Sequence, residues 1–482
     1  MNNRKKYVGG TFALFGLLFL LTSLISPEIR RYEQHRSYNT EIEDTCLSTD
    51  PESFSSKLPV ITVDTAGQEI PGRPKPGERA HDQEDTMIRA QVQIRETEGT
   101  LHRLSDEPEL DSGAEIRVRG NSSRWFEKTG YLLKFLKEDG TESKYSIMGM
   151  EPESTWVLHG PYLDKTMMRN YMWYNLSGQI MEWAPDVRFC ELFLNGSYQG
   201  IYVMTEHIDV AEGRLDLTRY DNRARICSYI VCADRENPFH STYLDNFSWY
   251  TLKSESRLEV KYPGKNKITP ELAEYISRDF SEFEKALYSY DYDSLRYGYR
   301  NYIDTGNFVD YFLINEMAMN IDAGLYSTYF YKDVSGKLKL AVWDFNNCVD
   351  NYQENTTPVE GFFMTERPWF YMLVKDEAFT ERVIMRYHSL RRGLFSDEAL
   401  TTYIDDVADY LGSAIARNNQ VWGSSFLPLR DPILDPERKI GSFEEAMNQY
   451  KSTLLARLDW LDKNIETLRS YSHDSLNKEY NH

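Results

Sequence analysis

Strand-like segments dominate the first half of the chain, and helix-like segments dominate the second half. Residues 114–136 alternate between apolar and polar side chains on both sides of Gly120, which is the two-residue period of strands. Thr269, followed directly by a proline, carries the signals that begin a helix. Further helices are expected at about 305–319, 376–393, 397–420 and 442–470. This segregation is typical of an α+β fold, with a β-rich lobe at 59–265 and a helical lobe at 266–470.

The composition supports one large folded region. At 482 residues the chain exceeds an average domain, but a single two-lobed enzyme of roughly 400 residues fits the length as well as two domains would. A hydrophobic fraction of 41% with 34 Tyr and 9 Trp excludes a mainly disordered chain. Residues 28–58 are polar and irregular, which predicts a stalk before a domain at 59–470, and residues 471–482 are expected to be a frayed polar tail.

The N-terminus carries an apolar segment of the length that crosses a bilayer. Residues 7–27 offer about 20 mostly apolar positions after a short basic tail at 1–6. This predicts a transmembrane signal anchor and a single-pass membrane protein, with a cleaved signal peptide as the alternative. Basic residues flank the segment on both sides, so its orientation stays open. The modestly favoured arrangement would place the main domain outside the cell, where ATP is scarce.

The charge and the cysteines limit the partners. A formal net charge of −20 argues against a nucleic-acid partner, because such binding depends on cationic contacts to phosphates. A basic protein segment that contains Ser or Thr is better matched, although the charge also favours solubility. The five cysteines are odd in number and lack zinc-site spacing, so we expect neither a metal site nor a disulfide framework.

The segment 320–347 contains two acidic turns separated by a predicted strand, a Ser-Gly turn and a second strand. In phosphoryl transfer one aspartate orients the acceptor hydroxyl, and another holds the magnesium ion that bridges the phosphates. Asp322 and Asp344 are our candidates for these two roles. The alternative interpretation is that both are ordinary solvated turn residues.

Several separated motifs accompany this segment in a fixed order. They are Arg119-Gly120-Asn121-Ser122-Ser123, Lys128 with Tyr131-Leu132-Leu133-Lys134, Trp156 with Asp164 to Asn170, Leu194 to Tyr202 leading to Glu206, Lys261-Tyr262-Pro263, Tyr311 to Glu316 through Asn320 and Asp322, and Val342-Trp343-Asp344-Phe345. In these motifs, residues 59 to 470 resemble the spore-coat protein CotH kinase-like family of atypical kinases. The resemblance implies a two-lobed, atypical protein-kinase-like fold, with ATP as the phosphate donor and Mg²⁺ or Mn²⁺ as the metal.

The resemblance also implies roles for basic residues. Lys134, on the second strand of 114–136, would hold the nucleotide phosphates and pair with Glu206, although Lys128 competes for the same role. An exposed strand lysine is the alternative for Lys134. Arg169 would contact a phosphate or, as a simpler interpretation, form a structural ion pair.

The turn after the first of these strands would be the phosphate loop. Its residues are Arg119, Gly120, Asn121 and Ser122, and small residues of this kind let backbone amides approach phosphates. An ordinary hairpin turn is the alternative interpretation.

Two departures from the family pattern concern the metal. Ser327 stands where the family usually carries Asn, and Asn346 stands where it usually carries a second Asp. Both retain an oxygen that can coordinate magnesium, but the loss of a carboxylate should weaken the metal site. A weakly active or inactive member is therefore an open alternative.

The leading hypothesis is a membrane-anchored CotH-like protein kinase that transfers the γ-phosphate of ATP to Ser or Thr of a surface or spore-coat protein. A second hypothesis is a noncatalytic surface module that binds a partner or assembles a coat. A third is a carbohydrate-active enzyme, suggested by the many aromatic and acidic residues. That enzyme would need a carboxylate pair across the scissile bond, which spacing in a sequence does not reveal.

Overall fold

The computed structural model describes residues 31–37, 42–75, 77–78, 85–237, 242–252, 255–351, 356–426 and 440–476. The chain divides into a short unit, Met1–Glu33, and a main unit, Gln34–His482. The fold described below is that of the main unit.

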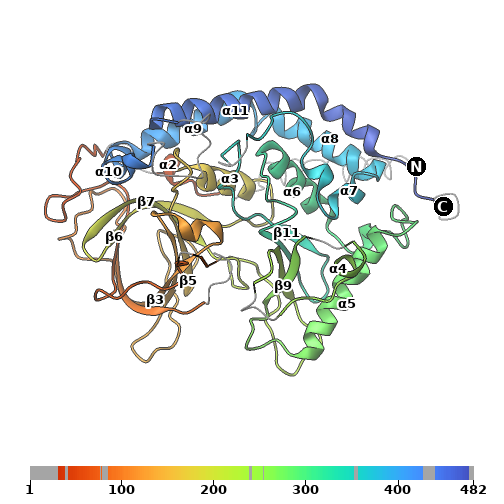
Figure 1. The fold of residues 1–482 in the computed structure, drawn as a ribbon, viewed down its shortest axis with the longest axis horizontal. Helices are drawn as coiled ribbons and strands as arrows, with labels where there is room; N and C mark the ends of the chain where they lie inside the picture. Colours follow the sequence, from red (N-terminus) through yellow and green to blue (C-terminus); the bar gives the residue numbers. More distant parts are fainter. Residues whose placement is uncertain are drawn as a thin grey trace, which may run out of the picture. The chain divides into compact units, whose positions relative to one another are not determined.

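Seven strands of the main unit form a closed barrel (Figure 1). They are β1 (Val60–Asp64), β2 (Ile88–Arg95), β3 (Leu110–Arg119), β4 (Gly130–Phe135), β5 (Thr155–His159), β6 (Val187–Leu194) and β7 (Ser197–Glu206), in the order β1-β2-β3-β4-β5-β7-β6. Neighbouring strands are antiparallel except β1 and β6, whose parallel pairing from Val60 opposite Glu191 to Val63 opposite Leu194 closes the barrel.

Alternation along the strands fills the barrel with apolar side chains. On β4, Tyr131, Leu133 and Phe135 are buried and belong to the same cluster as Trp156 of β5 and Met204 of β7. The interior is therefore a packed core, as expected for a barrel of this strand number. Asn195 and Gly196 both have positive φ angles (49° and 76°), as in the type I′ hairpin turn between β6 and β7 that this dipeptide favours.

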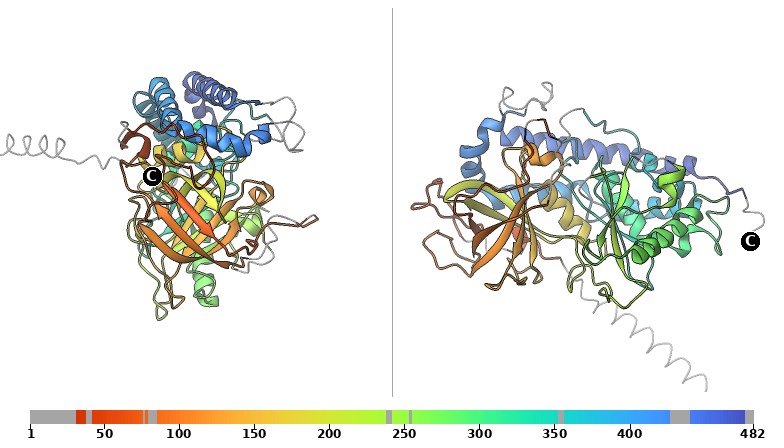
Figure 2. Two further views of the ribbon diagram at one scale, coloured as in Figure 1. Left: turned by 90° about the vertical axis from the view of Figure 1, so that its left-hand side faces the viewer. Right: turned by 60° about the horizontal axis from the view of Figure 1, so that its bottom comes forward.

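A second, antiparallel sheet has the order β11-β10-β8-β9. Its strands are β8 (Tyr229–Asp234), β9 (Arg257–Tyr262), β10 (Thr328–Lys332) and β11 (Lys339–Ala341). Figure 2 shows this sheet beside the barrel as a separate body. Two of its strands come from the segment between Asp322 and Asp344, and β8 comes from the connection that leaves the barrel.

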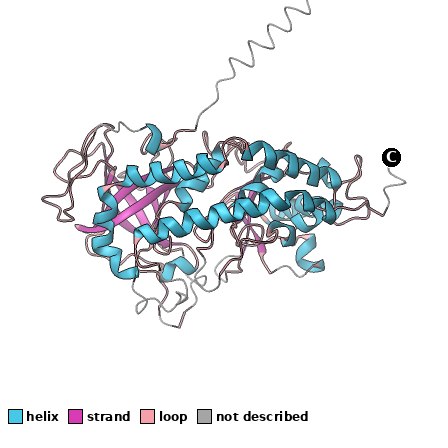
Figure 3. Cartoon of the chain, turned by 90° about the horizontal axis from the view of Figure 1, so that it is seen from above, coloured by secondary structure: helices cyan, strands magenta, loops and turns pink. Residues whose placement is uncertain are grey.

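Most of the described helices lie along one side of both sheets, whereas α4 and α5 lie beside the second sheet (Figures 1 and 3). The described helices are α2 (Gln34–Ser37), α3 (Arg169–Gly178), α4 (Phe247–Thr251), α5 (Pro270–Leu287), α6 (Thr305–Met317), α7 (Phe370–Leu373), α8 (Glu377–Arg391), α9 (Asp397–Leu411), α10 (Ser413–Trp422) and α11 (Phe443–Asn464), with 3-10 segments η2 (Ser122–Trp125), η3 (Tyr299–Asn301), η4 (Met364–Glu366), η5 (Gly423–Phe426) and η7 (Ile465–Tyr471).

Local signals explain where the long helices begin and end. The Thr269 side chain accepts a hydrogen bond from Leu272 N at the start of α5, as its sequence predicts. The single helix expected at 397–420 is two helices, because the chain turns at Gly412 with a φ of 46° that favours glycine.

The expected two-lobed, atypical protein-kinase-like fold is wrong. The strands of the first half close into a barrel, because β1 pairs with the distant strand β6 as well as with β2. The two strands expected between Asp322 and Asp344 do form, as β10 and β11, but they join β8 and β9 of the expected β-rich lobe in one sheet. Local periodicity identifies strands, but it does not show which distant strands pair.

The membrane expectation is corrected as well. Across the described ranges, no helix combines the length and the apolar character that a membrane crossing requires. This finding stands against the predicted single-pass membrane protein. Residues 7–27, where we expected the transmembrane helix, lie outside the described residues.

Candidate functional site

Three aspartates follow elements of the second sheet and its neighbouring helix. Asp234 ends β8, Asp322 lies just after α6, and Asp344 lies three residues after β11 with a φ of 58°. Each follows a buried apolar run, so the packing of that run fixes where its aspartate emerges. The two acidic turns that the sequence singled out therefore belong to one region.

Hydrogen bonds tie the Asp322 and Asp344 turns to each other. Asn347 Nδ2 donates to Asp322 Oδ2 at 3.0 Å, and the backbone N–H of Asn346 donates to Asp344 Oδ1 at 3.3 Å. Asn320 Nδ2 donates to the Asp344 carbonyl at 3.1 Å. The turn of the candidate metal ligand Asp344 is therefore joined to the turn of the candidate catalytic residue Asp322.

Asp344 faces a small cleft between the barrel and α3. The cleft is lined by Arg119, Val157, His159, Asn170, Tyr174, Thr205, Trp343 and Asp344. The Arg119 guanidinium lies 5.5 Å from the centre of the Trp343 ring. The volume available inside the cleft is about 10 Å³, far below the roughly 300–1,000 Å³ of most small-molecule sites. As it stands, the cleft has room for about one water molecule, so a nucleotide would have to open it.

The environment of Asp344 sets its acidity. Burial raises the pKa of the Asp344 carboxyl above its ordinary value, and the nearby charges of Asp322 and Asp234 act in the same direction. The positive charge of Arg119 opposes this rise. The pKa of the Asp234 carboxyl is also raised, chiefly by burial and in the same direction by the Asp322 charge. The three aspartates thus act on one another electrostatically.

Basic residues gather around His207 and His159. Burial lowers the pKa of His207 to about 3, and neighbouring positive charges add to this effect. In order of their effect, these charges are Arg214, Arg119, Arg117 and Lys261. His159, which lines the cleft, also has its pKa lowered to about 3, by burial and then by Arg119. An anion would reduce the mutual repulsion of these cations.

The structure gives Lys134 and Glu206 separate partners. Lys134 Nζ lies 2.7 Å from Glu142 Oε1, and both side chains are partly exposed. Glu206 is buried, accepts a hydrogen bond from the Asp186 amide at 2.9 Å and lies 3.9 Å from Arg214 Nε. The strand register places β5 between β4 and β7. The ion pair expected between Lys134 and Glu206 is therefore not formed.

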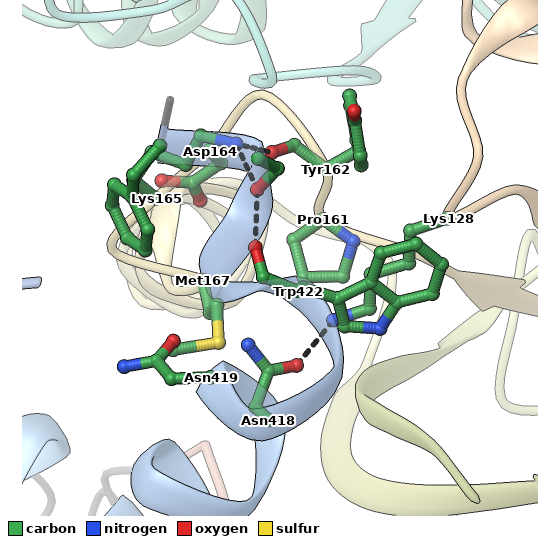
Figure 4. Close-up of a pocket in the computed structure, with 11 residues that line it drawn as sticks. Lys128, Pro161, Tyr162, Asp164, Lys165, Met167, Asn418, Asn419 and Trp422 are labelled. Carbon is green, nitrogen blue, oxygen red and sulfur yellow. Dashed lines mark hydrogen bonds between the residues drawn. The ribbon is translucent and has the colours of Figure 1, made fainter. Parts of the chain in front are cut away.

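Lys128 occupies a different pocket, between the barrel and α10 (Figure 4). Its Nζ donates to Asn418 Oδ1 at 2.7 Å, and the side chain is only 2% exposed. Lys165 lines the same pocket and donates to Ser425 Oγ at 2.7 Å. Burial, followed by the charge of Lys165, lowers the pKa of Lys128 well below its usual value. Lys128 thus joins two elements and does not face Asp344.

Arg169 is a structural residue at the start of α3. Its guanidinium pairs with Asp164 at 2.6 Å and donates to the carbonyls of Cys348 and Val349 at 3.0 and 3.3 Å. The side chains of Arg169 and Asp164 are both buried. Arg169 therefore fixes the segment that follows Asp344, which matches the simpler of its two expected roles.

The predicted phosphate loop lies at the end of β3. Arg119 reaches the Asp344 cleft, whereas Gly120, with a φ of 112°, begins a tight turn. This φ favours glycine, and a Cβ atom at Gly120 would also lie 2.1 Å from Ser123 Oγ unless that side chain turned away. Asn121 and Ser122 lead into η2, and the Asn121 carbonyl accepts a hydrogen bond from the Arg124 amide.

The two predicted metal ligands that depart from the family pattern differ in placement. Asn346 Oδ1 accepts a hydrogen bond from Asn170 Nδ2 at 3.2 Å, beside the cleft. Ser327 lies in the turn before β10 with a φ of 49°, and its side chain makes no hydrogen bond with a described residue. In the described part of the chain, no three His, Cys, Asp or Glu side chains form a ready-made metal site.

Two residues of the site were missed by the sequence analysis. Asp234 ends the apolar run Tyr229–Asp234, and an acid directly after a buried strand could have signalled it. Asn347 follows the proposed metal ligand Asn346 directly, but only the folded turn shows that its amide reaches Asp322.

Carboxylates opposed by guanidinium groups across a cleft are typical of proteins that bind phosphorylated ligands together with a divalent metal. A family model described as CotH kinase protein matches residues 116–461, which is more than half of the chain. The chain therefore belongs to the CotH kinase protein family, and the resemblance noted in its sequence is confirmed. A search of curated proteins found no match.

Proposed function

We propose that this protein is a protein kinase that transfers the γ-phosphate of ATP to a Ser or Thr hydroxyl of a protein substrate, such as a surface or spore-coat protein. The observation that carries the proposal is the joining of the Asp322 and Asp344 turns through Asn347, with Asp344 facing Arg119 across one cleft. Phosphoryl transfer needs positioned charges more than covalent chemistry, and this arrangement supplies both signs of charge.

The residues of the site fit a magnesium or manganese ion. Asp322 and Asp344 offer carboxylate oxygens, and Asn320 Oδ1 is buried without a hydrogen-bond partner among the described residues. Hard oxygen ligands suit these ions, and Mg²⁺ commonly binds through one or two carboxylates together with substrate phosphates. A cluster of three carboxylates is therefore not required. The metal, when bound, would neutralise charge on the phosphates.

Each residue has a distinct part in the proposed reaction. Asp344 would hold the metal, and Arg119 would face the phosphate oxygens. Asp322 would accept the proton of the acceptor hydroxyl while a bond forms between that oxygen and the γ-phosphorus. The bond between the γ-phosphorus and the bridging oxygen breaks, and ADP leaves. Lys134 is a poor choice for the nucleotide lysine, because Glu142 holds it away from Glu206.

Transfer of labelled phosphate tests the proposal. The full chain is incubated with γ-labelled ATP, Mg²⁺ or Mn²⁺, and a mixture of Ser- and Thr-containing peptides. Asp322→Asn and Asp344→Asn should each lower incorporation by about 100-fold or more, because general-base and charge-stabilising groups contribute factors of this order. Asp406→Asn, on the exposed face of α9, is the matched control and should leave incorporation unchanged.

A noncatalytic binding module is the second candidate function. The small cleft volume and the amide of Asn346 in place of a carboxylate favour it. In that case the folded chain incorporates no phosphate with either metal, and nucleotide binding is insensitive to metal. Incorporation that is equal in the native chain and in Asp322→Asn would also contradict the kinase proposal.

A further inference from the structure

A larger pocket lies beside the Asp322 turn, which contributes Leu325 to its wall. It has a volume of about 460 Å³ and is lined by Ser248, Leu252, Glu255, Tyr288, Leu325, Glu366, Arg367, Pro368 and Tyr371. These residues come from α4 and the residues after it, the end of α5, the Asp322 turn and the segment from η4 to α7. Figure 1 shows α4, α5 and α7 at the same end of the main unit.

Two close contacts join this pocket to the Asp322 turn. Arg367 Nη2 donates to the Ile321 carbonyl at 2.6 Å, next to the proposed catalytic aspartate. Gly324 packs against Arg367 so closely that a Cβ atom would lie 2.7 Å from Arg367 Cβ. Leu325, three residues after Asp322, forms part of the pocket wall. A polypeptide in the pocket would therefore pass beside the residue that we propose to receive the hydroxyl proton.

A buried carboxylate holds the walls of the pocket together. Glu284 of α5 accepts hydrogen bonds from Ser248 N at 3.0 Å, from Ser248 Oγ at 2.6 Å and from Trp369 Nε1 at 2.9 Å. It therefore links α4 to the segment that carries Glu366 and Arg367. A pocket fixed by so many hydrogen bonds is formed before any ligand binds.

The charges in the pocket favour a basic occupant. Glu255 and Glu366 are exposed on two different walls, and neither forms an ion pair with a described residue. Arg367 is the basic residue of the lining, and its Nη2 donates to the Ile321 carbonyl. Two glutamates and one arginine leave the lining with a net charge of −1. The Tyr288 and Tyr371 rings, 5.8 Å apart, offer faces that attract a cation, as Lys375 over the Tyr371 ring at 5.4 Å illustrates.

We propose that this pocket binds a Lys or Arg side chain of the acceptor polypeptide and so selects basic substrates. The inference rests on the proposed kinase function and adds the substrate class and its binding residues. The rim charges Glu255 and Glu366 would pair with the basic side chain, and the two tyrosines would contact its aliphatic stem. The net charge of −20 would speed the approach of such a substrate without fixing its position.

Peptide binding tests the inference without relying on catalysis. Two fluorescently labelled peptides, each with a central Ser and flanked by either Arg or Ala residues, are titrated with the full chain and followed by anisotropy. The Arg peptide should bind more tightly than the Ala peptide. Glu255→Gln and Glu366→Gln should each weaken binding of the Arg peptide by about two- to fivefold, the range of one partly exposed ion pair. Glu366→Arg should weaken it further.

A matched variant separates the pocket from the general negative charge of the protein. Glu274→Gln removes an exposed carboxylate from α5, far along that helix from Tyr288, and should leave binding unchanged. Equal losses for Glu274→Gln and Glu366→Gln, or equal affinity for both peptides, would overturn the inference. Pocket-dependent binding without phosphate incorporation would sustain the pocket and reject the kinase function. Phosphate incorporation with the same KM for both peptides would sustain the kinase function and reject the pocket.

Discussion

Asn347 controls the position of Asp322 through one hydrogen bond. Asn347→Ala should lower kcat for phosphate incorporation by about tenfold, because Asp322 loses the donor that orients it. KM for ATP should change little, since Asn347 does not line the Asp344 cleft. Steady-state kinetics on the native and variant chains measure both values. A rise in KM with an unchanged kcat would contradict a positioning role.

His159 makes folding sensitive to acid. Its pKa is about 3 in the folded chain and about 6.5 when unfolded, so the unfolded state binds more protons between these values. His159 therefore leaves the free energy of unfolding undiminished above about pH 6.5 and lowers it progressively as the pH falls below that value. Lowering the pH from 7 to 5 should cost about 2 kcal/mol through this residue.

Urea unfolding at both pH values measures this effect. His159→Gln should remove that part of the loss, whereas His388→Gln, at a partly exposed position of α8, should not. Identical pH dependence in the native chain and His159→Gln would contradict the assignment.

At the residue scale, the positions of the acidic side chains followed the sequence prediction more closely than the pairing of Lys134. Asp322 and Asp344 follow apolar runs, and their turns do meet through residues 344–347. Lys134 lies on a strand as expected, but alternation alone does not show that its outward neighbour is Glu142. Asp234 and Asn347 join the site only through pairing of segments far apart in the chain.

At the scale of elements, α10 depends on a glycine in the β6–β7 hairpin. A Cβ atom at Gly200 would lie 2.4 Å from Asn418 Oδ1 and 3.2 Å from Trp422 Cδ1. Asn418 Oδ1 accepts hydrogen bonds from both Lys128 Nζ and Ile201 N, so it has little freedom to move. Gly200→Ala should therefore destabilise the protein by about 2–4 kcal/mol, combining overpacking with strain at positive φ.

Gly196 offers the matched control for this prediction. It lies in the same hairpin and also has a positive φ, but no described atom lies within 4 Å of the point where a Cβ atom would sit. Gly196→Ala should thus cost only the strain, about 1–2 kcal/mol. Chemical denaturation compares the two, and equal losses would show that α10 yields to the added methyl group.

The elements themselves were largely predictable. Thr269, Asp304 and Ser442 cap their helices with side-chain hydrogen bonds, and the capping residues mark the starts of α5, α6 and α11 in the sequence. The break at Gly412 was missed, because the apolar pattern continues from α9 into α10.

At the scale of the whole molecule, a buried ion pair attaches α11 to α6. The Arg457 guanidinium pairs with Glu316 and donates to the Val359 and Gly361 carbonyls at 2.7 Å each. Arg457→Met should destabilise the protein by about 3–5 kcal/mol, because the Glu316 carboxylate stays buried without its cation. Calorimetry of the folded chain measures the loss.

Lys463→Met on the same helix serves as the comparison. Lys463 pairs with Asp459, and both side chains are more than 60% exposed. Its replacement should cost less than about 1 kcal/mol. Similar losses for Arg457→Met and Lys463→Met would mean that α11 attaches through apolar contacts alone.

The global topology was the least predictable level. Strands first and helices later correctly describes much of the order of elements, but the closed barrel depends on β1 and β6 meeting. That pairing is decided by how the buried faces of both strands pack, and no local pattern at Val60–Asp64 reveals its second neighbour.

Barrel closure has a consequence for anyone who shortens this protein. The family match begins at residue 116, inside β3, so a chain cut to 116–461 would lack β1, β2 and half of β3. Strand β6 and the remaining end of β3 would then present unpaired backbone groups at two open edges. Such edges pair readily with other chains. Protein trimmed to the boundaries of sequence similarity should therefore accumulate as insoluble aggregate, and cutting before Val60 would avoid this.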